Sequence, residues 1–507
     1  MLQIFKDMTV VLAFALAIFQ LAKPIAAHFT SGADFTRRRN VWLALTAVAF
    51  LSPSFWLFVA VAIPVLLWAG RKDSNPIALY LLLLHVIPSL SIPIPTIGIK
   101  ELFDLDSYRL LSFCILIPFA LRLRRAKDTV PIAGLRTMDV LLLAWGALHV
   151  LLYVPPDLPG HVILPDSLTN MLRRGLLFLV DVYVLFFAVS RGCADRGDLR
   201  DAMAAFCLGC AIMAAVATFE GARHWLLYAD LQWRWTGSAN RTYLERAGVL
   251  RAQASAGHSL ALGYLLAIAF GFWLYLQTYL VSKRLRFTVA ILFCLGLLAA
   301  YSRGPWIGAV AIYLAFMAVG PGTFGRIFKA ATAVAVVLGV VSLTPLGERI
   351  FKVLPFMGGS KNDVTVAYRE QLAARSWQLI LQHPFLGNQL AYSKMEDLRQ
   401  GEGIIDLVNT YAEVTLFYGF IGLFFFFGFV WLALVRAYRT VRGTGLSDLD
   451  FARLGASLVA CILGTMLMLV ESAFILGFEK MFYVLAGLAV AYSQMRPASA
   501  AATATTV

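Results

Sequence analysis

One arginine, Arg303, stands where two apolar segments of the chain meet. The first segment ends at residue 300 and the second begins at residue 305, with the turn Tyr301-Ser302-Arg303-Gly304 between them. Serine and glycine permit a tight turn, and Gly304 and Gly308 form a GxxxG pattern that lets helices approach closely. A guanidinium at the mouth of a helix bundle keeps its charge and can bind a phosphate group through two parallel hydrogen bonds. The alternative is an interfacial arginine that only anchors a hairpin turn.

A second group of chemically capable residues lies in the long polar stretch 347–408. Residues 364–382 have the spacing of an amphipathic helix that carries Arg369, and Pro384 and Gly387 end it. Such a helix would lie across a membrane surface as a lid or cleft wall. Arg369 is as compatible with an ion pair as with a bound ligand, and His383, directly before a proline, is compatible with a structural cap.

The stretch 222–257 is basic and interleaves arginines with aromatic residues. These are Arg223, Arg234, Arg241, Arg246 and Arg251, with Trp225, Tyr228, Trp233 and Trp235. Aromatic rings beside arginines suit sugar faces and anionic groups, and they equally suit an ordinary interfacial belt. Composition alone leaves both readings open.

The amino-acid composition indicates that transmembrane helices position these residues. Hydrophobic residues make up 60% of the 507 residues and charged ones only 14%, against about a quarter in a soluble protein. The mean hydropathy is +0.76. Apolar runs separated by short basic loops predict an all-α polytopic membrane protein with about 12–14 transmembrane helices. The expected spans are 8–27, 41–69, 77–97, 108–121, 138–153, 175–189, 202–220, 259–281, 287–300, 305–319, 330–343, 411–435, 454–476 and 481–492.

The net charge of +14 is explained by basic loops rather than by a nucleic-acid groove. Basic clusters recur at alternate loops, and the positive-inside rule makes them cytoplasmic, which places both termini inside and both long stretches outside. Arg37, Arg38 and Arg39 conflict with this topology if 41–69 is one span. A hairpin turn at Ser52-Pro53-Ser54 removes the conflict and moves the amino terminus outside; the sequence leaves the two possibilities open.

The expected organisation follows from these loops. It comprises N-terminal transmembrane helices at 1–221, a first periplasmic loop at 222–258, and transmembrane helices with the Ser-Arg-Gly turn at 259–346. A large periplasmic loop at 347–408, C-terminal transmembrane helices at 409–495 and a disordered tail at 496–507 complete it.

Several familiar patterns give no support to other chemistry. The DxD sequence Asp104-Leu105-Asp106 recurs as Asp448-Leu449-Asp450 on the opposite predicted side, which shows how easily it arises. The pair Cys207 and Cys210 lies inside an apolar segment and is interpreted as core. The sequence has no Walker loop, no HExxH and no Cys/His metal cluster, so we expect neither cofactor nor metal.

Together the polar motifs resemble the O-antigen ligase and polymerase superfamily of bacterial membrane glycosyltransferases. The resemblance runs from about residue 251 to 422. It is carried by Arg251, Gly257-His258, Ser302-Arg303-Gly304, Arg369, His383-Pro384, Gly387, Asn409-Thr410-Tyr411-Ala412-Glu413 and Tyr418-Gly419-Phe420-Ile421-Gly422. The order and spacing of these motifs around one outward loop make the set more specific than any single motif.

The resemblance implies a GT-C-like, metal-independent enzyme of the bacterial inner membrane. Its donor would be an undecaprenyl-pyrophosphate-linked glycan, its acceptor a second glycan, and polysaccharide assembly proteins are possible partners. Arg251, Arg303 and Arg369 would hold the pyrophosphate leaving group, with Asn409 and Tyr411 also at the substrate.

One position departs from the family pattern. Ligases of this family typically have a histidine directly before the asparagine, and here that position is Val408. This difference favours a polymerase of the exopolysaccharide or capsule type over a ligase that transfers glycan to lipid A core. The base that accepts the acceptor's proton could be His258, His383, Asp406 or Glu413, and the sequence does not choose among them.

The rival hypothesis is a flippase or transporter for the same lipid-linked sugar. A transporter needs charges along a central cavity, often with paired broken helices in matching halves. Here Glu471 and Asp181 are among the few acidic residues in or near the spans. The scarcity of interior charge and the two long outward loops favour the enzyme.

Overall fold

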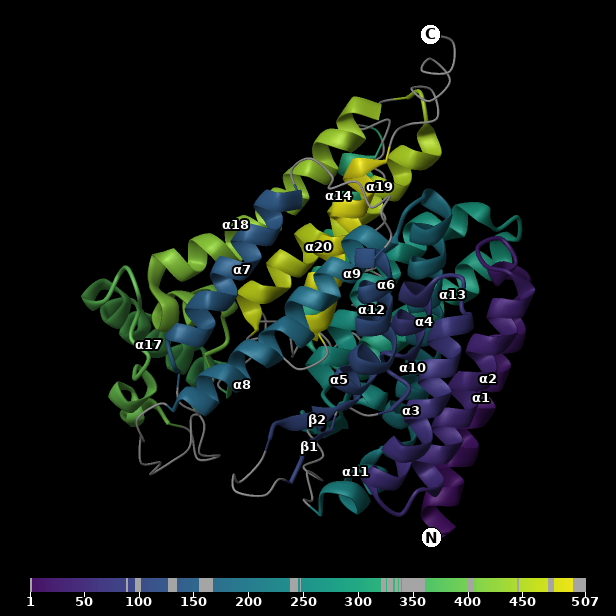
Figure 1. Ribbon diagram of the computed structural model, residues 1–507, viewed down its shortest axis with the longest axis horizontal. Helices are drawn as coiled ribbons and strands as arrows, with labels where there is room; N and C mark the ends of the chain where they lie inside the picture. Colours follow the sequence, from purple (N-terminus) through teal and green to yellow (C-terminus); the bar gives the residue numbers. More distant parts are fainter. Residues whose placement is uncertain are drawn as a thin grey trace.

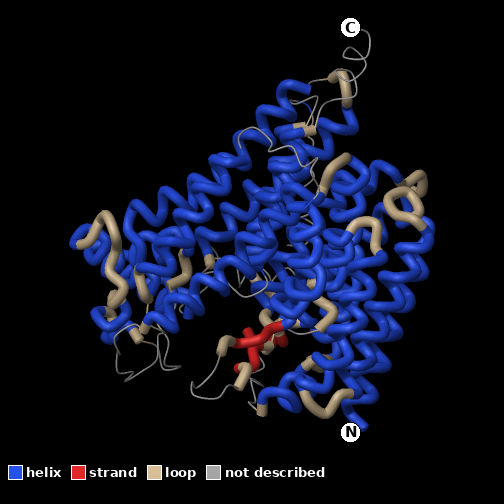
Figure 2. The backbone as a smooth tube through the Cα atoms, viewed as in Figure 1, coloured by secondary structure: helices blue, strands red, loops and turns tan. Residues whose placement is uncertain are grey.

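The computed structural model describes residues 2–87, 90–95, 102–125, 135–154, 167–237, 245–246, 248–320, 325, 332, 336, 339, 361–399, 405, 407–444, 446–472 and 478–495. Nearly all of its regular structure is helical, which confirms the predicted all-α class (Figure 2). The longer helices are α1 (Leu2–Ala26), α2 (Gly32–Leu51), α3 (Phe55–Lys72), α7 (Leu135–Leu151), α10 (Arg196–Arg223), α12 (Ser259–Leu276), α13 (Lys283–Ala300), α14 (Arg303–Val319), α17 (Lys361–Gln382), α18 (Thr410–Thr444), α19 (Leu449–Met468) and α20 (Phe478–Gln494).

The shorter elements fill the ends of these helices and the loops. They are α4 (Pro76–Leu83), α5 (Ser107–Leu111), α6 (Ile117–Arg125), α8 (Leu168–Phe178), α9 (Val184–Gly192) and α11 (Ala229–Thr236). Two antiparallel strand pairs join β1 (Ser91–Pro93) to β2 (Asp104–Asp106) and β3 (Glu245–Arg246) to β4 (Val249–Leu250). Single π-helical turns at Ser112–Leu116 and Leu179–Tyr183 link α5 to α6 and α8 to α9.

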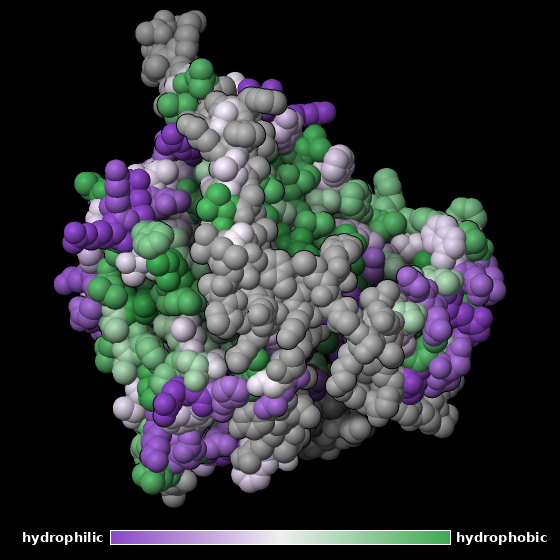
Figure 3. All heavy atoms as spheres, turned by 180° about the vertical axis from the view of Figure 1, so that it is seen from behind, coloured by the Kyte–Doolittle hydropathy of each residue, from purple (hydrophilic) through white to green (hydrophobic). Residues whose placement is uncertain are grey.

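Six described helices are long and apolar enough to cross a membrane: α1, α3, α10, α12 with its extension to Tyr279, α18, and α19 with its extension to Glu471. Other predicted spans are assembled from shorter pieces, as in α5 and α6. Of the predicted span 330–343, the structure describes residues 332, 336 and 339. Apolar side chains cover broad areas of the face in Figure 3, with hydrophilic ones gathered toward its margins. The chain is therefore a multi-pass membrane protein.

Arginine-rich loops gather at one end of the bundle, which we call the basic end. There the buried guanidinium of Arg38 donates to Asp73 at 2.7 and 3.0 Å and to Asp201 at 2.7 and 2.8 Å. Arg196 pairs with Asp448 at 2.7 Å, and Arg200 pairs with Asp450. These contacts join the start of α10 to α2, α3 and α19.

The segment 41–69 is not one span. Helix α2 ends at Leu51 and α3 begins at Phe55, with Ser52 and Ser54 as the caps on either side of the turn. The hairpin alternative is confirmed, since it places Arg38 at the basic end. The start of α1 and the end of α20 lie toward opposite ends of the molecule (Figure 1), which agrees with the alternative that moves the amino terminus outside.

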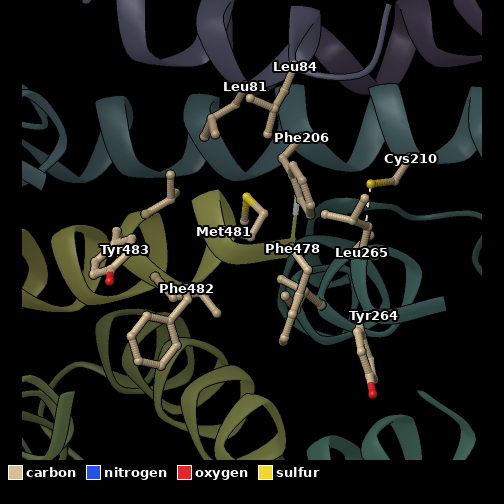
Figure 4. Packing of buried hydrophobic residues seen from close by; sticks show 14 of the residues in the cluster. Leu81, Leu84, Phe206, Cys210, Tyr264, Leu265, Phe478, Met481, Phe482 and Tyr483 are labelled. Atoms are coloured by element: carbon tan, nitrogen blue, oxygen red, sulfur yellow. Dashed lines mark hydrogen bonds between the residues drawn. The ribbon is translucent and has the colours of Figure 1, made fainter. Parts of the chain in front are cut away.

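Two central helices, α10 and α12, carry the apolar core. Phe206 and Cys210 of α10 face Leu265 of α12, and the Cys210 thiol donates to the Leu265 carbonyl (Figure 4). All six cysteines are free, and Cys207 and Cys210 are buried in this core, as their apolar context predicts.

Glycines bring three helices, α12, α14 and α19, unusually close together. A Cβ on Gly263 of α12 would lie 2.6 Å from Pro305 of α14. A Cβ on Gly308 of α14 would lie 2.3 Å from Met468 of α19, which confirms the close approach predicted from the GxxxG pattern. These three helices bring the start of α14 beside the outer parts of α12 and α19. We call this end, opposite the basic end, the loop end.

Candidate functional site

The turn that carries Arg251 is fixed by a buried carboxylate. Glu220, near the end of α10, accepts backbone N–H bonds from Leu227 at 3.0 Å, Gln253 at 3.0 Å and Ala254 at 2.8 Å. The Ala252 N–H also donates to the carbonyl of Ala299 at 2.9 Å, at the end of α13. Arg251 therefore sits on backbone tied to two helix ends rather than on a free loop.

Arg251 reaches directly to the Ser-Arg-Gly turn, where its guanidinium donates to the hydroxyl of the buried Ser302. Tyr301 ends α13 in the left-handed conformation at φ 46°, and Arg303 is the first residue of α14. Trp306 braces this turn by donating its indole N–H to the Leu297 carbonyl at 2.7 Å. The sequence prediction that Arg251 and Arg303 act at one place is consistent with this contact, which joins Arg251 to the residue before Arg303.

The hydroxyl of Tyr264, on α12, marks the centre of the site. It lies 3.1 Å from the position that a Cβ on Gly304 would take. Its coulombic interactions include those with Glu471, Arg251 and Arg369, three residues from separate parts of the chain. Its ring packs against Phe478 of α20 with ring centroids 4.5 Å apart, as Figure 4 also shows. The outer ends of α12, α14 and α19 therefore meet here, and Arg369 of α17 is near enough for its charge to act on the Tyr264 hydroxyl.

Arg369 is an exposed residue of α17, the helix predicted at 364–382. Leu372 and Leu379 are buried on its inner side, which confirms the amphipathic pattern. Helix α17 lies beside the first half of α18 at the left of Figure 1. What holds it there is the segment that follows it.

The His383-Pro384-Phe385-Leu386-Gly387 motif docks into a break in α18. Gly419 interrupts that helix with φ 66° and ψ −171°, so the neighbouring backbone groups lose their helical partners. The carbonyl of Pro384 accepts from Phe420 N–H at 2.8 Å, and that of Phe385 accepts from Ile421 N–H at 3.3 Å. In return, Asn388 N–H donates to the Leu416 carbonyl at 2.7 Å and the Gln389 side-chain amide donates to the Phe417 carbonyl at 2.8 Å.

Two glycines make this interlock possible. A Cβ on Gly387 would lie 2.4 Å from the backbone carbon of Phe417, and a Cβ on Gly419 would lie 2.1 Å from the Phe385 oxygen. Both glycines have positive φ, 70° and 66°. The two glycine motifs that looked separate in the sequence are thus two halves of one contact, which we call the glycine interlock.

The start of α18 is tied to the end of α19. Asn409 caps α18 by accepting from Ala412 N–H at 3.0 Å, and the hydroxyl of Tyr411 donates to the Met466 carbonyl at 2.9 Å. Thr410 donates to the Ser472 carbonyl twice, from its backbone at 3.0 Å and from its hydroxyl at 2.6 Å. Asn409 and Tyr411, predicted to contact substrate, make these structural contacts at the rim of the site.

The predicted bases occupy different surroundings. His258 caps α12, and its Nδ1 accepts from Leu260 N–H at 3.2 Å. Burial, and then the charge of Arg251, lower the pKa of His258 to about 4. The ring of His383 is exposed, and the contributions of this motif to the interlock come from backbone atoms. Glu413 acts electrostatically on Tyr418, whose hydroxyl is 2.8 Å from His149 of α7. Asp406 lies outside the described residues.

Both DxD sequences have structural contacts. Asp106 caps α5 by accepting from Arg109 N–H at 2.7 Å, and Asp448 caps α19 by accepting from Phe451 N–H at 3.1 Å. Among the described residues, no group of three or more His, Cys, Asp or Glu side chains could hold a metal ion.

Sequence reasoning missed Tyr264, Glu220 and the site position of Glu471. Tyr264 and Glu220 lie within apolar segments that predict membrane spans. Only the position of Glu220, near the end of its segment, indicates a polar role. The sequence shows Glu471 as an acidic residue near a span, but it does not show that Glu471 lies beside the turn that carries Arg303.

The geometry defines a class: an all-α, multi-pass membrane protein with a basic, arginine-bearing site at one end of its bundle. Arginines brought together in this way suit a multiply charged phosphate ligand.

Residues 287–427 match a family model described as O-antigen ligase. This match agrees with the resemblance to the O-antigen ligase and polymerase superfamily that the motifs carry. The family is one of glycosyltransferase-type ligases and polymerases with lipid-linked glycan substrates. The matched region includes Arg303, Arg369 and the first half of the interlocked helix, whereas Arg251 and Glu471 lie outside it. No match was found among curated proteins.

Proposed function

We propose that this chain polymerises oligosaccharide repeat units linked to undecaprenyl pyrophosphate, at the periplasmic face of the bacterial inner membrane. The observation that carries the proposal is the meeting of arginines from distant parts of the chain at the loop end. Arg251 contacts Ser302, Arg303 follows it, and both Arg251 and Arg369 act on Tyr264. A departing pyrophosphate gains negative charge, and fixed guanidinium groups stabilise that charge best when they need not reorganise.

The reaction needs no activated nucleotide. The acceptor hydroxyl attacks the anomeric carbon of the donor sugar, and the bond from that carbon to the pyrophosphate oxygen breaks. The electron pair of the broken bond goes to the pyrophosphate, and the arginines offset its charge. A base must take the proton of the acceptor hydroxyl. We propose that this chemistry is metal-independent.

Polymerase and ligase differ only in the acceptor. The family description names a ligase, and this supports glycan transfer to lipid A core as the second candidate. Val408 stands where ligases of this family typically have a histidine, and this supports the polymerase. Exopolysaccharide, capsule and O-antigen remain the candidate products.

The test is Arg303→Ala in the native host, with Arg399→Ala as the matched control. Arg399 lies in the same outer region and is neutralised locally by Glu396, at 2.6 Å. Polymer is resolved by gel and lipid-linked intermediates by mass spectrometry, at equal membrane levels of each variant. We expect Arg303→Ala to abolish polymer and to build up single lipid-linked repeats.

Other outcomes identify the rivals. Full-length polymer that stays on its lipid carrier identifies a ligase. Single repeats confined to the cytoplasmic leaflet identify a flippase. Unchanged polymer in Arg303→Ala cells refutes a catalytic role for the arginine site.

A further inference from the structure

A carboxylate that none of the sequence motifs includes stands beside the arginines. Glu471 is the last residue of the 3₁₀ turn Leu469–Glu471, which extends α19 at the loop end. It is exposed, while its neighbours Leu469 and Ser472 are buried. An ionised side chain in or near a membrane-spanning segment costs free energy, so an acidic residue at this position is a candidate functional residue.

Three observations place Glu471 in the site. Its Cβ is 3.8 Å from the position that a Cβ on Gly304 would take, and Gly304 directly follows Arg303. Its charge acts on the Tyr264 hydroxyl, on which Arg251 and Arg369 also act. The next residue, Ser472, accepts both hydrogen bonds of Thr410, so the turn is held against the start of α18.

The other candidate bases are less suited to the proton transfer. His258 uses the lone pair of Nδ1 to cap α12, which leaves its other ring nitrogen as an N–H donor. Glu413 acts on Tyr418, from which the contacts continue to His149 of α7. Glu471, in contrast, lies beside Gly304 of the arginine-bearing turn itself.

We infer that Glu471 is the general base of the transfer reaction. This inference rests on the proposed function and assigns the one role that it leaves open. A Glu471 oxygen takes the proton from the acceptor hydroxyl as the acceptor oxygen bonds to the anomeric carbon. The bond between that carbon and the pyrophosphate oxygen breaks in the same displacement, so the configuration at the anomeric carbon is inverted. This assignment requires the arginines on the leaving-group side of the anomeric carbon and the carboxylate on the acceptor side.

The experiment uses the full-length protein in lipid vesicles, with the lipid-linked repeats that accumulate in Arg303→Ala cells as donor and acceptor. We compare wild type with Glu471→Gln, Glu471→Asp and the control Glu370→Gln. Glu370 is exposed on α17, one residue from Arg369. Removing a general base lowers rates by about 10²- to 10⁴-fold.

We expect Glu471→Gln to lower kcat by about 10²-fold or more, with donor binding within about two-fold of wild type. Glu471→Asp should recover part of the rate, since it keeps a carboxylate, and Glu370→Gln should match wild type. Nuclear magnetic resonance of the product linkage should show inversion.

Failure of the base assignment and failure of the proposed function give different results. If wild type polymerises, Arg303→Ala does not, and Glu471→Gln retains full kcat, the base assignment is overturned and the polymerase remains. Retention of configuration would also overturn it, because a single displacement cannot retain. If Glu471→Gln loses donor binding as strongly as it loses rate, Glu471 positions the donor and is not the base. If wild type itself forms no polymer from this donor, the proposed function fails first.

Discussion

The glycine interlock predicts that one added methyl group will disable the site from a distance. In Gly419→Ala, the new Cβ would lie 2.1 Å from the Phe385 oxygen, closer than any packed structure allows. The segment 384–389 must then leave the break in α18, and α17 moves with it because the segment follows α17 directly. Arg369, on α17, would then move relative to Tyr264.

The magnitude follows from the backbone. At φ 66° and ψ −171°, Gly419 occupies a region open essentially to glycine alone, where another residue is strained by about 1–3 kcal/mol. Alanine also favours the uninterrupted helix by about 1 kcal/mol relative to glycine. Together these effects shift the balance toward a closed helix by about 2–4 kcal/mol, a factor of roughly 30 to 900. The steric overlap adds to this shift.

The matched control is Gly428→Ala in the same helix, where a new Cβ meets nothing within 4 Å. Polymer synthesis in vesicles and hydrogen exchange of peptides covering 384–391 are measured for both variants. Gly419→Ala should lose activity by about 10²-fold and exchange faster in that segment, since small misplacements of a binding group have effects of this size. Equal activity and equal exchange in the two variants would refute the reasoning.

Three further predictions concern the fixed parts of the site. His258→Asn should keep both the activity and its pH dependence from pH 5 to 8, because asparagine caps helices well and a histidine whose pKa is about 4 is neutral over that range. His258→Ala, which removes the cap, should lower the melting temperature. Loss of the acid limb of the pH profile in His258→Asn would contradict a purely capping role. Ser302→Ala should weaken donor binding several-fold at normal membrane levels, because Arg251 loses its hydrogen-bond acceptor, as titration in vesicles would measure; unchanged binding would count against this anchor. Asp181→Asn should destabilise the protein by about 3–5 kcal/mol, because Arg109 at 2.9 Å and Lys480 at 3.3 Å lose a buried ion-pair partner. The loss should appear as a lower yield and a lower melting temperature. Unaltered stability would show that both cations form ion pairs with other carboxylates.

The sequence predicts the class of protein and the local structure around Arg303 and Arg369 well. Hydropathy indicates the spans, and the spacing of Arg303 between two apolar segments indicates a helix-mouth arginine, which is where the structure has it. The amphipathic helix around Arg369 is also correct, since Lys361–Gln382 is helical. These features succeed because each depends on a local pattern of residue types.

The missed features depend on contacts between distant segments. For residues 41–69 the sequence left one span and a hairpin both open, because Ser52-Pro53-Ser54 is short beside two strongly apolar runs. The role of Gly419 depends on Phe385, and the place of Glu471 depends on the bonds between Thr410 and Ser472. No periodicity joins residues so far apart, and single-sequence reasoning has no signal for them.

The way each arginine is held differs, and this difference bears on catalysis. Arg251 stands next to a turn fixed by two backbone bonds to Glu220, and Arg303 begins a helix packed through glycines against α12 and α19. Arg369 instead depends on a helix attached through the glycine interlock. Stabilising a charge that develops during the reaction requires groups already in place, which the first two satisfy. In the proposed reaction a long glycan must also enter and leave, and of the three arginines it is Arg369, on the outer helix, that is exposed. The glycine interlock thus holds Arg369 in position while leaving it on the outer helix, where the substrate must pass.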